Sequence, residues 1–85
     1  MDFTNIDFKG GKVRIIEPLG EDMLEAHYEN GYMIDVGFIE HMNSFFVTII
    51  KDNDWVNIEK EIEVKTENDL FAQIKYAIDY VLSQK

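Results

Sequence analysis

The segment that decides the fold runs from Leu24 to Val36 and reads LEAHYENGYMIDV. A three-residue loop at 29–31, with Gly31 in the left-handed conformation, would place the apolar residues of both flanking strands on one face. The facing pairs are then Tyr28 with Tyr32, Ala26 with Ile34, and Leu24 with Val36. A short helix over 21–30 that ends at Gly31 is the alternative, but it gives few apolar contacts. We favour the hairpin.

The apolar face continues in the next two segments. Residues 32–39 alternate, and residues 44–51 are dense in Phe, Val, Thr and Ile, which favour strands. Joining Phe38 to Phe45 across a loop at 39–44 pairs Val36 with Val47 and Ile34 with Ile49. Both segments are therefore predicted to be antiparallel strands of one sheet.

Residues 58–65 alternate with period two, which predicts a strand with one buried face and one wet face. Ile58, Ile62 and Val64 share the apolar face, and the wet face carries Glu59, Glu61 and Glu63. Upstream, residues 12–17 are predicted to be a strand. The segment 8–12 is expected to turn a first hairpin, whose other strand contains Phe3, Ile6 and Phe8.

A C-terminal helix is predicted over 67–83. Thr66 stands three residues before Asp69, as in a capping box, and the acids of the first turn suit the helix dipole. Apolar residues then recur at steps of three and four, at Leu70, Ile74, Ala77, Ile78, Val81 and Leu82. The predicted fold class is α+β: one domain over 1–85, an antiparallel β-meander of about five strands with one C-terminal helix on one face.

Composition excludes several classes of protein. The 85 residues contain no cysteine, which excludes disulfides, zinc–thiolate sites and cysteine nucleophiles. The formal net charge is −9, and the eight basic residues are scattered, so neither direct nucleic-acid binding nor an anionic membrane is expected. A basic protein partner is electrostatically favoured. With no signal-peptide pattern and no apolar run of membrane length, the expected location is the cytoplasm.

No motif for catalysis, for a cofactor or for a metal is found. His27 and His41 form no paired metal motif, and no serine lies in a nucleophile-elbow pattern. Asp52, Asp54 and Glu63 mimic the spacing of a calcium loop, but Asn57 occupies the position that needs glycine. We therefore expect an Asp/Asn-rich turn, and a protein that is not an enzyme.

The predicted face away from the helix mixes carboxylates with Met33, Phe46 and Ile50, which is typical of an interaction surface. Packing under the N-terminal segment or in a homodimer is the alternative for this apolar material. Trp55, next to the acidic turn, could lie in the core or at a binding rim. The candidate partner-binding residues are Asp35, Phe46, Asp52, Asp54, Trp55, Glu59, Glu61 and Glu63.

The stretch 24–37, followed by residues 49–55 and a helix that opens near Asp69, resembles small acidic proteins of bacterial toxin–immunity pairs. The similarity is one of general layout over about residues 24–82, and the first 20 residues do not match. It implies a protein that binds and blocks a cognate toxin, often a nuclease with a basic cleft. The alternative is a homo-oligomeric or accessory subunit.

Overall fold

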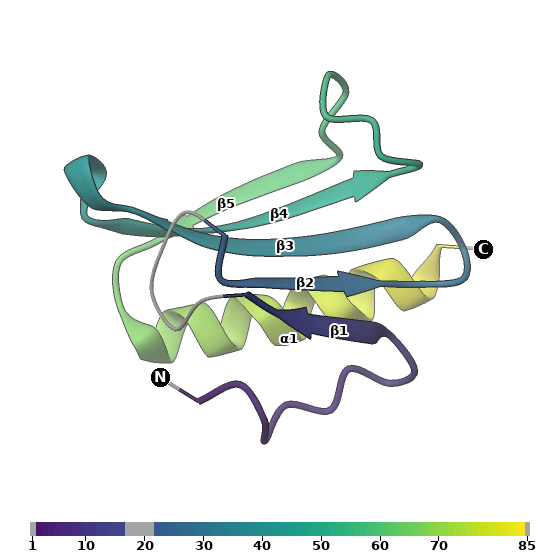
Figure 1. Ribbon diagram of the computed structural model, residues 1–85, viewed down its shortest axis with the longest axis horizontal. Coiled ribbons are helices and arrows are strands. Elements are labelled where there is room, and N and C mark those ends of the chain that lie inside the picture. Colours follow the sequence, from purple (N-terminus) through teal and green to yellow (C-terminus); the bar gives the residue numbers. More distant parts are fainter. Residues whose placement is uncertain (1, 17–21, 85) are drawn as a thin grey trace.

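A computed structural model describes residues 2–16 and 22–84. It contains a five-stranded antiparallel sheet in the order β1-β2-β3-β4-β5 and a C-terminal helix, α1, that packs against one face (Figure 1). The α+β fold predicted from the sequence is confirmed. The elements are β1 (Lys12–Ile15), β2 (Leu24–His27), β3 (Tyr32–Ile39), the 3-10 turn η1 (Glu40–Met42), β4 (Ser44–Lys51), β5 (Lys60–Val64) and α1 (Glu67–Ser83).

The β2–β3 hairpin forms in the predicted register. Leu24 lies opposite Val36 and Ala26 opposite Ile34. The Tyr28 N–H donates to the Tyr32 carbonyl at 2.9 Å, and Gly31 adopts a φ of +88°. A positive φ is accessible to glycine without a Cβ clash, so this residue closes the three-residue loop.

The β3–β4 pairing is also the predicted one, with Val36 opposite Val47 and Ile34 opposite Ile49. It extends to Ile39 and Ser44, so the connection is the short turn η1 rather than a six-residue loop. Asn43, at a φ of +50°, reverses the chain after η1. Asparagine tolerates this region better than most residues with a Cβ.

The prediction for the last strand was wrong at its start. β5 begins at Lys60, and Ile58 lies in the β4–β5 loop with a side chain that is 39% exposed. The Glu59 N–H donates to the Ile49 carbonyl, although Ile49 is the partner of Lys60 in the ladder. Glu59 and Lys60 thus both lie opposite Ile49. This one extra residue shifts the alternation of side chains before Lys60, so Ile58 does not share the buried face of Ile62 and Val64.

The predicted first hairpin does not form, although its turn does. The Gly11 N–H donates to the Phe8 carbonyl at 3.2 Å, but residues 2–8 pair with no strand. β1 pairs with β2 instead, and the Glu17 end of the predicted strand lies outside the described residues. The segment before the turn buries Phe3 and Phe8 in the main core.

The core therefore has two covering elements on the same side of the sheet. α1 packs across β3, β4 and β5, and it buries Leu70, Ile74, Ala77, Ile78 and Val81. The N-terminal segment runs beside α1 on the β1 side (Figure 1). Its Phe3 ring lies 5.8 Å from that of Phe71, and the Tyr28 hydroxyl donates to the Phe8 carbonyl at 2.8 Å. No helix in the described residues is long and apolar enough to cross a membrane.

Candidate interaction surface

The face of the sheet opposite α1 is organised in rows that run across the strands. One row contains Arg14, Glu25, Asp35, Thr48 and Glu61, one residue from each strand. The neighbouring rows contain Lys12, His27, Met33 and Ile50 on one side, and Gly37, Phe46 and Glu63 on the other. Four of the predicted site residues, Asp35, Phe46, Glu61 and Glu63, therefore share this face.

Glu25 and Asp35 are directly opposed on β2 and β3. Like charges in this position destabilise a sheet. Burial, together with the charges of Asp22 and Glu25, raises the pKa of Asp35 to about 6. Within residues 2–16 and 22–84, the ion pairs join Lys9 to Asp79, His27 to Glu25 and Lys65 to Glu63, so Asp35 has no cationic partner there.

Glu25 was not among the predicted site residues, although the predicted register already placed it beside Asp35. Its Oε1 lies 3.2 Å from Nε2 of His27, two residues along the same strand. The central acidic pair is therefore Glu25 and Asp35, with Glu61 two strands further along the row.

The apolar part of this face is smaller than expected. Met33 and Ile50 face each other on the two central strands, and both are buried, with exposed fractions of 5% and 0%. Thr48 is buried as well. Phe46 is half-buried and is thus the large apolar side chain that remains available to a partner on these strands.

Glu63 belongs to a hydrogen-bonded cluster near η1. Its Oε2 accepts a hydrogen bond from the Ser44 hydroxyl and lies 3.2 Å from Nζ of Lys65. These two contacts lower the pKa of Glu63. Lys65 also donates to the Met42 carbonyl at 3.0 Å, and Ser44 is fully buried. Because Lys65 offsets the charge of Glu63, this carboxylate contributes less to the field of the face than Asp35 or Glu61.

Asp52 and Asp54 lie in the β4–β5 loop, at the far end of β4 from Phe46 (Figure 1). The Asp54 carboxylate accepts hydrogen bonds from the backbone of Val56 and Asn57 and from Nδ2 of Asn57, which lowers its pKa. The Asp52 N–H donates to the Gly31 carbonyl at 2.8 Å. Asp54 thus stabilises the loop through its carboxylate, and Asp52 joins the loop to the β2–β3 turn through its backbone. The loop is the Asp/Asn-rich turn that the sequence predicted.

Trp55 and Glu59 lie apart from the central row. Trp55 is half exposed and its neighbour Val56 is 90% exposed, so this loop presents apolar side chains to solvent. Glu59 was predicted to share the wet face with Glu61, but its Oε2 accepts from the Tyr80 hydroxyl of α1 at 3.2 Å. The interrupted alternation before β5 explains this difference, because it turns Glu59 toward the helix side.

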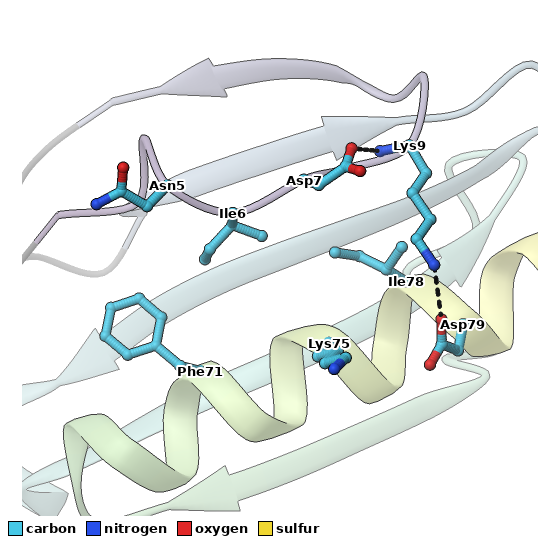
Figure 2. A pocket seen from close by; sticks show the side chains of 8 residues that line it. All are labelled: Asn5, Ile6, Asp7, Lys9, Phe71, Lys75, Ile78 and Asp79. Carbon is cyan, nitrogen blue, oxygen red and sulfur yellow. Dashed lines mark hydrogen bonds and ion pairs between the residues drawn. The ribbon is translucent and has the colours of Figure 1, made fainter.

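A groove between the N-terminal segment and α1 has a volume of about 280 Å³ (Figure 2). Ile6, Phe71 and Ile78 supply its apolar lining, and an ion pair of 3.6 Å between Lys9 and Asp79 crosses one end. No group of three or more residues able to hold a metal ion occurs among the described residues.

Comparison with protein-family models, with curated proteins and with solved structures finds no match for this chain.

Proposed function

We propose that this chain is a non-catalytic protein-binding module, an immunity- or antitoxin-type inhibitor that neutralises a basic cognate toxin in a bacterial cytoplasm. Its acidic sheet face would occlude the active-site cleft of the toxin, for example that of a nuclease, whose cleft attracts phosphates. Carboxylates would then occupy the positions of those phosphates. Complementary charge of this kind speeds association and selects partners.

The observation that carries the proposal is the opposition of Glu25 and Asp35. The fold retains two facing carboxylates without a Lys or Arg ion pair among the described residues, at a cost in stability. A basic side chain of a partner, inserted between them, would remove that repulsion. The net charge of −9 provides the long-range field for encounter.

Phe46 supplies an apolar anchor one row from Asp35, and Glu61 extends the acidic row toward the sheet edge. A half-buried aromatic ring beside carboxylates is the usual composition of an energetic centre with a polar rim. Asp52, Asp54, Trp55, Glu59 and Glu63 would belong to the periphery of such an interface. The carboxylates of three of them, Asp54, Glu59 and Glu63, already accept hydrogen bonds within the chain.

The test begins with capture of salt-eluting proteins from the host on the immobilised chain, followed by purification of the partner. Association rates are then measured at ~50 mM and ~200 mM salt for the wild type and for Asp35→Asn/Glu61→Gln. We expect the double variant to associate about tenfold more slowly at low salt and to depend less on salt. The matched control is Glu29→Gln/Glu67→Gln, which removes two exposed acids outside the rows and should change the rate less.

The purified partner must also lose its activity when the wild-type chain binds, because an inhibitor blocks as well as binds. Equal rates for the two double variants would contradict the acidic face as the interface. Full partner activity in the complex would contradict inhibition.

The second candidate is a homo-oligomeric or accessory subunit. The exposed Trp55 and Val56 favour it, because adjacent exposed apolar side chains often mark an assembly surface. Sedimentation equilibrium decides between the two: a monomer at micromolar concentration argues against self-assembly.

A further inference from the structure

β1 forms an open edge of the sheet, since it pairs with β2 alone. The Tyr28 N–H donates to the Tyr32 carbonyl, so every second residue of β2 counted from Tyr28 bonds toward β3, and the residues between them, His27 and Glu25, bond toward β1. Their partners Lys12 and Arg14 therefore bond toward β2, and the Ile16 N–H, which donates to the Met23 carbonyl at 3.0 Å, is in the same phase. The backbone N–H and C=O groups of Val13 and Ile15 therefore point outward, and no described turn or loop residue bonds to them.

The side chains along this edge are apolar on one face and basic on the other. Val13 and Ile15, on the helix side of the sheet, are 40% and 50% exposed. Lys12 and Arg14 point to the opposite face, in the rows that contain His27 and Glu25. Native edge strands are usually protected from further pairing, whereas β1 combines outward backbone groups with exposed β-branched residues.

The charge of this edge is opposite to that of the chain as a whole. Neither Lys12 nor Arg14 takes part in the ion pairs of the described residues, and the neighbouring Glu25 is held by His27. A second copy of β1 is a poor occupant, because antiparallel pairing centred on Val13 or Arg14 would place cation against cation. An incoming strand with carboxylates on that face would meet both cations.

We propose that the free edge of β1 is a β-augmentation site for an extended segment of another protein in which acidic and apolar residues alternate. Its backbone would bond to Val13 and Ile15, its acidic side chains would lie beside Lys12 and Arg14, and its apolar side chains would cover Val13 and Ile15. Lys12 and Arg14 lie at the β1 end of the same sheet face as the acidic pair, but this site uses the backbone edge and takes a partner of the opposite charge. The inference therefore does not depend on the proposed inhibitor function.

The probe is a blocked peptide of about seven residues that alternates glutamate with valine. Amide hydrogen exchange, read residue by residue by NMR, should slow at least about tenfold at Val13 and Ile15 when the peptide is added. The Arg14 amide, already bonded to β2, should change little. A peptide that alternates lysine with valine is the matched control and should leave all three amides unchanged.

Two variants test the geometry and the charge separately. Val13→Pro removes an outward N–H while sparing the bonds to β2, so it should abolish peptide binding in a folded protein. Arg14→Glu keeps the backbone and should lower the affinity for the acidic peptide at least about tenfold, through repulsion across the pair.

Three results would overturn the proposal. Binding of the acidic peptide without slower exchange at Val13 and Ile15 would place it elsewhere. Unchanged affinity of the Arg14→Glu variant for the acidic peptide would show that the cations of β1 do not select the peptide by charge. Slower exchange on concentrating the protein alone would show that the occupant is a second copy of this chain.

Discussion

Asn30, in the β2–β3 turn, donates a hydrogen bond of 2.9 Å from Nδ2 to the backbone carbonyl of Val81 in the last turn of α1. The same Nδ2 donates to the Gln84 carbonyl at 2.8 Å. The last carbonyls of a helix have no partner within the helix, and α1 has no basic residue in its last turn. The hairpin turn therefore caps the helix, although the two segments lie 51 residues apart.

Replacing Asn30 by Ala should lower the free energy of unfolding by about 1–2 kcal/mol, because it removes a donor from both carbonyls and leaves that of Val81 with the Gln84 N–H alone. Urea denaturation measures the loss, and hydrogen exchange should speed up in the last turn of α1. Asn5→Ala is the control, because Asn5 is an exposed asparagine whose side chain makes no hydrogen bond within the described residues. Equal losses for the two variants would argue against the cap.

Gly31 is constrained by its backbone and by a neighbouring turn. At its φ of +88° a side chain is strained, and a Cβ would also collide with the Asp52 carboxylate. We expect Gly31→Ala to be at least ~1 kcal/mol more destabilising than Gly10→Ala. Gly10 also has a positive φ, but a Cβ there meets no atom within 4 Å.

The double variant Gly31→Ala/Asp52→Gly should recover the part of the loss that comes from the collision. Thermal and urea unfolding of the four proteins give the comparison. If Gly10→Ala costs as much as Gly31→Ala, the contact between the two turns has no energetic weight.

Local sequence was sufficient for the central hairpins and the helix. Alternation around Glu29-Asn30-Gly31 fixed the register of β2 and β3, because a slip by one residue would expose every apolar side chain. Thr66 marked the start of α1, where its hydroxyl accepts from the Asp69 N–H at 3.1 Å. Since the register was predictable, the opposition of Glu25 and Asp35 was predictable too.

The structure differs from the sequence-based predictions where contacts between segments distant in the chain set the position of a residue. The apolar residues of the N-terminal segment do not alternate regularly, so the sequence predicts no face for Phe3 and Phe8. Both enter the core because α1 covers β3, β4 and β5 and leaves the β1 side of the sheet for this segment. Glu59 leaves the acidic face because the Ile49 carbonyl binds its N–H and Tyr80 binds its carboxylate. The raised pKa of Asp35 likewise follows from burial, which alternation alone does not report.

Asp35 should make the stability of this protein depend on pH. Its folded pKa, about 6, lies above the ordinary value of 3.8, so the folded state holds the proton more tightly than the unfolded state. Folding is therefore penalised as the pH rises from about 4 to above 6, and the penalty is absent at lower pH. Asp35→Asn should be more stable than the wild type by about 2 kcal/mol near neutral pH.

The difference between the two proteins should shrink toward zero near pH ~4, where the wild-type carboxyl is protonated in both states. Urea denaturation across this pH range measures it. Glu29→Gln, at an exposed position in the β2–β3 turn, controls for the loss of one negative charge. A constant difference between wild type and Asp35→Asn at all pH values would contradict the raised pKa.

The two faces of the sheet should respond differently to the loss of a phenylalanine. Phe3 is 4% exposed and packs on Phe71, so Phe3→Ala opens a cavity where the N-terminal segment meets α1. We expect a loss of about 3 kcal/mol, in the range for buried phenylalanines. Phe46 is half-buried on the opposite face, so Phe46→Ala should lower the free energy of unfolding by less, about 1–2 kcal/mol.

Urea denaturation of both variants, with hydrogen exchange at β1 and β2, tests this difference between the two faces. If Phe3→Ala unfolds no more easily than Phe46→Ala, the N-terminal segment is not part of the core, and α1 alone stabilises the sheet.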